Sequence, residues 1–253
     1  MKRFISKILI FCMLALIMPN NSFAIEITPE FLAKEMLRLN KEARIPELKA
    51  AYYAFGNLIE TKGKFENLDI GWLSFDKEND KLLIGCSGVV YCGYTLQDEG
   101  LKKLGYDLIG FGGVFDDELI ELMQSLGDKK YKKIVIFGGV NDLNIRAMYE
   151  FTDIDLYYCE ILNKMLAEAK QHLIDESGEV YYVKVKPMIY GIDSGDELFV
   201  YRYNNMAKEI NDNIELFGYK SYEFPQDTSA EYTEHYVHFN NATVYEAMFN
   251  AIG

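Results

Sequence analysis

The sequence predicts an α/β domain in which helices cover both faces of a central parallel sheet. From Lys81 onward, short apolar runs alternate with stretches of helical periodicity, and this alternation is typical of such sheets. Three of the runs are soon followed by small or polar residues: Ser87, the pair Gly112 and Gly113, and Asn141. Because ligands bind at the carboxyl ends of the strands in these sheets, we expect the three segments to meet at one functional edge.

The expected elements follow one another in a regular order. The strands are short apolar runs, which cover residues 82–84, 107–109, 133–137, 180–185 and 221–224. The helices have apolar residues at helical spacing, and they cover about residues 96–104, 116–126, 145–174, 204–216 and 243–252. A further short strand or hairpin arm is expected earlier in the chain, at residues 72–75.

The N-terminal residues have the pattern of a secretory signal peptide. Lys2, Arg3 and Lys7 precede an apolar run at residues 8–18, and small residues then lead to a cleavage position after Ala24. The apolar run is too short to cross a bilayer of roughly 30 Å. The sequence therefore predicts export to the periplasm or the cell exterior, without stable membrane insertion after cleavage.

Three regions are expected along the chain. Residues 1–24 form the signal peptide, and residues 25–80 form an N-terminal helical segment that packs on the core. Within this segment, a helix is expected to begin near Thr28, and a second one covers about residues 46–59. Residues 81–253 form the α/β domain, which is long enough to bury a substantial core.

The chain is strongly acidic. It has 26 Lys and Arg against 39 Asp and Glu, a net charge of −13. The signal peptide has three basic residues and no acidic one, so its removal lowers the charge to −16. Such a balance disfavours nucleic acid and anionic lipid as electrostatic partners, and it favours neutral or cationic substrates.

The cysteines do not form the framework of a disulfide-rich protein. Three remain after cleavage, Cys86, Cys92 and Cys159, so at least one thiol is unpaired. Buried free thiols are the expected state, and a bridge between Cys86 and Cys92 is the alternative. No C-x-x-C or H-E-x-x-H spacing occurs, and we therefore expect no metal or other cofactor.

Three side chains have the chemistry that acyl transfer needs. Ser87 offers a hydroxyl nucleophile, Asn141 a neutral amide for an oxyanion, and His238 a base in a polar loop before the last helix. Each also has a structural reading, since serine favours turns and Asn141 or Asp142 could cap a helix. Of the other histidines, His172 lies in a polar helical segment and is expected to face solvent.

Taken together, these segments resemble the SGNH hydrolases, also called the GDSL-like lipase/esterase superfamily. The resemblance spans about residue 81 to the C terminus and implies a three-layer α/β/α sandwich of the flavodoxin-like kind. It is carried by four short segments in the same order as in the family: Gly85-Cys86-Ser87, Gly110-Phe111-Gly112-Gly113, Gly139-Val140-Asn141-Asp142-Leu143 and His238-Phe239.

The resemblance also implies a role for each site residue. The nucleophile of the family corresponds to Ser87 and its base to His238. The oxyanion donors correspond to the Ser87 backbone N–H, a glycine N–H (Gly113 rather than Gly112) and the Asn141 side chain.

The sequence departs from the family pattern at both acidic positions. Cys86 stands where the family has the aspartate before its serine, and His235 stands where it has an aspartate three residues before its histidine. A histidine cannot orient and stabilise the His238 imidazolium as a carboxylate does, which implies weak activity. Glu234 or Glu231 could take over that role, or Ser87 and His238 could act as a dyad. The Cys86 thiol is a competing nucleophile, although a neighbour of Ser87 is expected to point elsewhere.

The sequence therefore predicts a secreted serine esterase or deacylase that acts on a small acyl ester, such as an O-acetylated carbohydrate. Two alternatives use the same fold: a catalytically impaired extracellular binding protein and an acyltransferase. Six tyrosines could line a sugar-binding cleft, although aromatic residues in strands and helices more often belong to the core. They are Tyr157, Tyr158, Tyr181, Tyr182, Tyr201 and Tyr203.

Overall fold

The computed structural model describes most of the chain from residue 65 onward. The described residues are 65–68, 71–76, 78–124, 126–191, 193–224, 239 and 241–253. The expected signal peptide and the two expected helices before residue 60 lie outside this part of the chain. The same is true of His238, His235, Glu234 and Glu231.

Within the described residues, a seven-stranded sheet has the strand order β1-β2-β4-β3-β5-β6-β7. Strands β3 to β7 are mutually parallel, as predicted, whereas β1 and β2 join one edge in antiparallel pairing. The strand expected at residues 72–75 is confirmed as β2. The bounds are β1 Phe65–Leu68, β2 Gly71–Ser74, β3 Lys81–Gly85, β4 Tyr106–Phe111, β5 Lys133–Phe137, β6 Glu179–Val183 and β7 Lys220–Tyr222.

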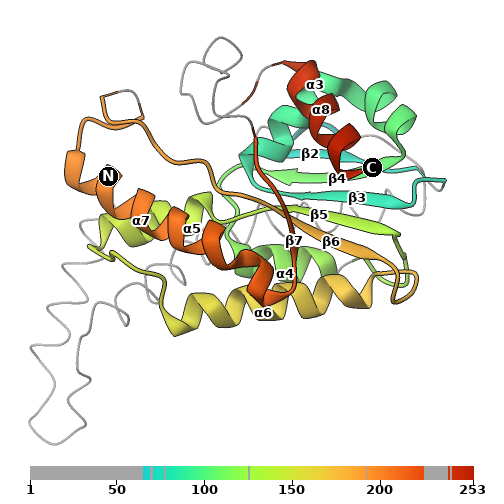
Figure 1. Ribbon diagram of the computed structural model, residues 1–253. Helices are drawn as coiled ribbons and strands as arrows, with labels where there is room; N and C mark the ends of the chain where they lie inside the picture. Colours follow the sequence, from blue (N-terminus) through green and yellow to red (C-terminus); the bar gives the residue numbers. More distant parts are fainter. Residues whose placement is uncertain are drawn as a thin grey trace, which may run out of the picture.

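Helices cover both faces of the sheet, and this confirms the three-layer sandwich (Figure 1). Helices α3 and α8 lie on one face, and α4 to α7 lie on the other. None of the described helices is long and apolar enough to span a membrane. The bounds are α3 Ser87–Leu104, α4 Asp116–Gln124, α5 Val140–Met148, α6 Leu156–Gln171, α7 Glu197–Asn213, the 3-10 helix η1 Ile214–Phe217 and α8 Ala242–Ile252.

The apolar runs of the central strands are buried on both sides. In β3, Leu82 and Ile84 pack beneath α4 to α7, whereas Leu83 packs beneath α3 and α8. In β5, Ile134 and Ile136 face the first layer, and Val135 faces the second. Successive side chains of a strand point to opposite faces, so a central strand covered on both sides favours apolar residues at successive positions.

Helix α3 begins nine residues earlier than predicted, at Ser87 instead of residue 96. Its first half contains glycine and β-branched residues, which have low helix propensity, and Val89, Val90 and Cys92 are all buried. That half therefore has no clear amphipathic pattern. Gln97 then interrupts the helix with a positive φ of 55°, so the prediction found only the part beyond the kink.

The long helix predicted over residues 145–174 is two helices, α5 and α6. Glu150 has a φ of 69°, which ends the first helix, and Asp155 caps the second by accepting a hydrogen bond from Tyr158 N at 2.8 Å. Arg146 is fully buried, and its Nη1 lies 2.9 Å from Asp155 Oδ2. Helix α7 likewise begins earlier than expected, because Asp196 caps it before Glu197.

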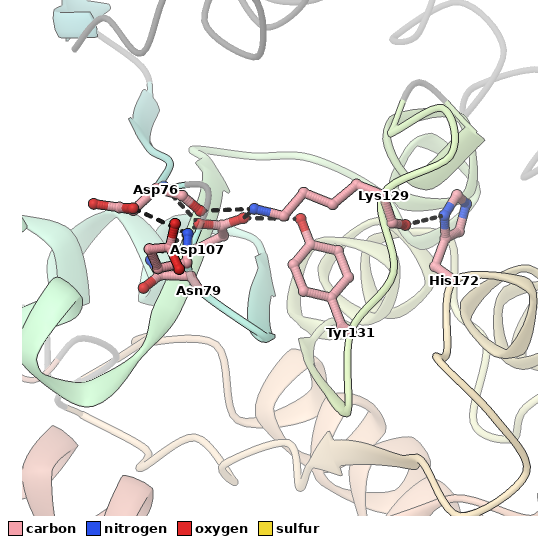
Figure 2. A network of polar contacts seen from close by, with 7 residues as sticks. Asp76, Asn79, Asp107, Lys129, Tyr131 and His172 are labelled. Atoms are coloured by element: carbon pink, nitrogen blue, oxygen red, sulfur yellow. Dashed lines mark hydrogen bonds and ion pairs between the residues drawn. The ribbon is translucent and has the colours of Figure 1, made fainter.

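The prediction that His172 faces solvent is wrong. His172 is buried at the end of α6, where the loop that carries Lys129 covers it (Figure 2). Its Nδ1 lies 3.3 Å from Lys129 O, and its Nε2 lies 3.3 Å from Glu168 Oε1. The polar residues around His172 gave no sign of this cover, which comes from a segment more than forty residues away.

Candidate functional site

The turns after three adjacent strands meet at the carboxyl edge of the sheet. Strand β3 lies between β4 and β5, and Gly85 at its end is level with Gly110 and Phe137. Ser87 follows the end of β3, Gly113 that of β4 and Asn141 that of β5, each within four residues of these level positions. The predicted convergence of these segments on one edge is therefore confirmed, whereas their catalytic roles stay predictions.

Ser87 is the first residue of α3 and is half-buried. Cys86 precedes it as the helix N-cap, and Cys86 N donates to Phe137 O at 2.9 Å, which ties the start of α3 to the end of β5. The first N–H groups of a helix have no partner within the helix and carry its positive dipole end. Ser87 therefore lies where negative charge is stabilised.

Cys86 is a buried, protonated thiol. Burial raises its pKa to about 11, so the thiolate is a minor form at neutral pH. Cys86 and Cys92 are both buried and free, as expected for packing cysteines, and they form no bridge. Cys159 is free and half-buried. The chemistry of Cys86 thus argues against it as the nucleophile of this edge.

Asn141 and Gly113 lie on neighbouring turns. The Asn141 Nδ2 donates to Val114 O at 2.8 Å, which uses one of the two N–H groups of the amide. Gly113 has a φ of 74°, and the space beside its Cα is open. Asn141 lies in the first turn of α5 instead of the loop before it. The two residues can thus present donors from adjacent turns.

Asp142 is not the cap of α5, contrary to one reading of the sequence. The N-cap is Gly139, whose φ of 83° favours glycine, and Asp142 lies fully inside the helix. The Asp142 side chain is buried, and its Oδ2 accepts a hydrogen bond from Asp116 N at 3.0 Å. Burial and the nearby carboxyls of Asp116 and Asp117 raise the pKa of Asp142 well above its usual range.

Asp116 is the site residue that sequence reasoning missed. It is fully buried at the start of α4, and its Oδ1 accepts from Gly139 N at 2.8 Å. Its Oδ2 accepts from Tyr158 Oη at 2.6 Å and lies 3.5 Å from Tyr182 Oη. Burial raises its pKa to about 6 despite these hydrogen bonds. In the sequence, Asp116 has the appearance of an ordinary acidic residue in the first turn of a helix.

The carboxyls of Asp116 and Asp142 do not form a metal centre. Across the described part of the chain, no three His, Cys, Asp or Glu side chains gather as metal ligands would. Tyr158 and Tyr182, two candidates for a sugar-binding cleft, are fully buried and face Asp116 instead. These two tyrosines therefore pack in the core beneath Asp116 and do not line a surface cleft.

The segment of the predicted base is described at one residue, Phe239, which directly follows His238. Phe239 is buried, and its ring centroid lies 4.3 Å from that of Phe224. The hydroxyl of Tyr245, on α8, lies 3.3 Å from Phe239 O and 3.0 Å from Gly88 O. One hydroxyl therefore joins the backbone after His238 to the first turn of α3, where Ser87 lies.

A small pocket of about 40 Å³ opens beside this edge. Most of its lining side chains are apolar, and Lys184, Lys186 and Asp193 add charge to its wall. The pocket lies between the end of β5, the segment after β6 and Phe239. The apolar or small residues that form it include Gly138, Val140, Val185, Met188, Phe224 and Phe239.

Comparison with known structures shows that the fold is similar to those of a GDSL-like lipase and an acylhydrolase. A GDSL-like lipase from Bacteroides thetaiotaomicron superposes with a TM-score of 0.55 and 17% identity, over 79% of this chain and 94% of its own. A proposed acylhydrolase from Bacteroides fragilis gives a TM-score of 0.50 and 15% identity, over 70% and 86% of the two chains. No known protein-family profile and no curated protein sequence matches the chain.

Proposed function

We propose that this protein is a serine esterase in which Ser87 is the nucleophile. The observation that carries the proposal is the meeting of three turns at one sheet edge, with Ser87 at a helix N-terminus and Asn141 bonded beside Gly113. A hydroxyl, a positive helix end and a neutral amide are what a tetrahedral acyl intermediate requires.

In the proposed reaction, Ser87 Oγ attacks the ester carbonyl while His238 takes its proton. The oxyanion accepts hydrogen bonds from the backbone N–H groups of Ser87 and Gly113 and from the second N–H of Asn141 Nδ2. His238 then protonates the leaving alcohol, and the acyl–serine ester forms. Water repeats the sequence with His238 as base, and this step releases the acid and restores Ser87.

A hydrogen-bonding partner shared by Phe239 and α3, the Tyr245 hydroxyl, supports His238 as the base. Tyr245 Oη lies 3.3 Å from Phe239 O and 3.0 Å from the carbonyl oxygen of Gly88, the residue after Ser87. Glu234 and His235 stay candidates for the group that orients His238. Since His235 stands where the family has the aspartate that orients its histidine, we expect a lower rate than a full triad would give.

The pocket beside the edge supports a small acyl ester as substrate. Its apolar wall, with Val140 and Val185, suits the acyl group, while Lys184 and Lys186 suit a polar alcohol portion. Together with the predicted export signal, these features make an acylated extracellular carbohydrate, with acetyl as the acyl group, the substrate that we propose.

The test is labelling with a fluorophosphonate probe, read by intact mass, together with hydrolysis of a short-chain aryl ester. We expect one adduct on the parent protein and none on Ser87→Ala or His238→Ala. The kcat/KM of Ser87→Ala should fall by about 10⁴-fold or more, because the nucleophile acts as a unit with its base.

Two variants serve as controls for this test. Ser177→Ala changes an exposed serine at the opposite edge of the sheet and should retain parent activity. Cys86→Ala should also retain most of the activity, because the buried thiol is not the nucleophile. Hydrolysis that survives Ser87→Ala would contradict the mechanism. Glycan binding without turnover or labelling would favour the binding-protein alternative.

A further inference from the structure

Three hydrogen bonds join the turn that carries Gly113 to the turn that carries Asn141. Gly139 N donates to Asp116 Oδ1 at 2.8 Å, and Asp116 N donates to Asp142 Oδ2 at 3.0 Å. Asn141 Nδ2 donates to Val114 O at 2.8 Å. Two of the three use a buried carboxyl, so the spacing of the two turns depends on Asp116 and Asp142.

The packing around Asp116 leaves its carboxyl little freedom to move. A side chain at Gly138 would place its Cβ 2.3 Å from Asp116 Oδ1, so the backbone of that turn lies directly against the carboxyl. On the other side, the hydroxyls of Tyr158 and Tyr182 lie 2.6 and 3.5 Å from Oδ2. The carboxyl is therefore clamped between the turn after β5 and two buried tyrosines.

Gly139 N is the group through which Asp116 acts. Gly139 has a φ of 83°, which favours glycine, and it is the N-cap that begins α5. Asn141 lies two residues further on. A shift of Gly139 would therefore move Asn141 and change where its amide points.

We propose that Asp116 is the positioning residue of the oxyanion hole, which it sets by holding Gly139 while Asp142 holds Asp116 in turn. The inference rests on the proposed function, because it assigns a role to Asn141 and Gly113 as oxyanion donors. Asp116 itself does not touch the substrate. Its effect on the reaction passes through the position of the Asn141 amide and the Gly113 N–H.

The test compares Asp116→Ala and Asp116→Asn with Asp107→Asn, a matched variant of a buried aspartate at the opposite end of the sheet. Asp116→Ala should lower kcat for the aryl ester by about 100-fold with KM within about twofold, the pattern of a lost transition-state interaction. Asp116→Asn keeps an oxygen for Gly139 N and should restore kcat to within about 10-fold of the parent. Asp107→Asn should leave kcat per folded molecule unchanged.

A second measurement separates positioning from general loosening and does not depend on activity. Amide hydrogen exchange should show a protected Gly139 N–H in the parent, fast exchange in Asp116→Ala and parent-like exchange in Asp107→Asn. The Asn141 side-chain amide resonances should shift in Asp116→Ala alone.

The outcomes distinguish this inference from the proposed function. Hydrolysis that requires Ser87 but retains its kcat in Asp116→Ala would overturn the inference and leave the function intact. Unchanged exchange at Gly139 would overturn it as well. Hydrolysis that does not require Ser87 would instead contradict the proposed function.

Discussion

Two buried aspartates at opposite ends of the same sheet have different surroundings. At the amino end, Asp107 lies in β4, and Lys129 Nζ is 2.5 Å from its Oδ2 (Figure 2). Tyr131 Oη, Asn79 Nδ2 and the amide of Asp76 also donate to it, at 3.0, 3.0 and 2.9 Å. At the carboxyl end, an amide and two tyrosine hydroxyls surround the Asp116 carboxyl.

The difference indicates two uses of a buried carboxyl. At the amino end of the sheet the Asp107 carboxyl stabilises the fold, and at the carboxyl end the Asp116 carboxyl fixes the position of a turn. Burial raises the pKa of Asp107, and the hydrogen bond and charge of Lys129 offset only part of this rise. At the carboxyl end, backbone and hydroxyl dipoles replace the cation, and the pKa of Asp116 is about 6.

The largest expected effect is on stability at the amino end. Asp107→Ala removes the acceptor for Lys129, Tyr131 and Asn79 together and should lower the free energy of unfolding by about 4 kcal/mol. Urea denaturation at neutral pH measures this loss, and the kcat of the folded fraction should stay at the parent value. A fall in kcat at full folding would show that the amino end also controls the reaction, and the contrast between the two ends would fail.

The second prediction uses the pH dependence of stability at the carboxyl end. The pKa of Asp116 is about 6 in the folded protein against an ordinary 3.8, so the folded state holds its proton more tightly than the unfolded state. Its contribution to stability is therefore full below pH 4 and is lost as the pH rises through 6, a loss of about 3 kcal/mol. In Asp116→Asn this loss should disappear.

Urea unfolding of the parent and of Asp116→Asn at several values between pH 4 and 7 measures the difference. The nearby groups Asp117, Tyr158 and Tyr182 are common to both proteins and largely cancel. The charge of Asp116 itself helps to raise the pKa of Asp142, so the measured difference covers both carboxyls. Parallel stability curves for the two proteins would show that Asp116 titrates normally in the folded state, as a well-solvated carboxyl does.

The fold could be predicted from the sequence wherever burial gives a simple pattern. Strand β5 was predicted at its observed bounds, Lys133–Phe137, because a strand covered on both faces is largely apolar and is bounded by polar residues or glycine. The start of α3 was missed for a related reason. Its first half, from Ser87, is also largely buried, so helical periodicity is absent, and its residues favour other structures.

The site was only partly accessible from the sequence. Ser87, Gly113 and Asn141 could be found because parallel strands bring the residues after their carboxyl ends to one edge. Asp116 could not, because its role depends on contacts with Gly139 and Tyr158, which tertiary packing alone creates. An acidic residue at the start of a helix has the same sequence pattern whether it is exposed or fully buried.

The smallest expected effect compares two glycines with positive φ at the two ends. Gly139 has a φ of 83°, and a Cβ there would lie 2.7 Å from Tyr182 Oη and 2.8 Å from Val185 Cγ2. Gly105, before β4, has a φ of 75° and open space around it. Both alanine variants incur the strain of the left-handed conformation, but Gly139→Ala also crowds the core, so it should cost about 2 kcal/mol more than Gly105→Ala. Thermal unfolding of both variants, together with aryl-ester hydrolysis, measures the contrast. Equal losses of stability and activity in the two variants would mean that the turn before α5 adjusts to a Cβ as easily as the end of α3 does. The turn would then not be rigid, and the inference that Asp116 fixes its position would be contradicted.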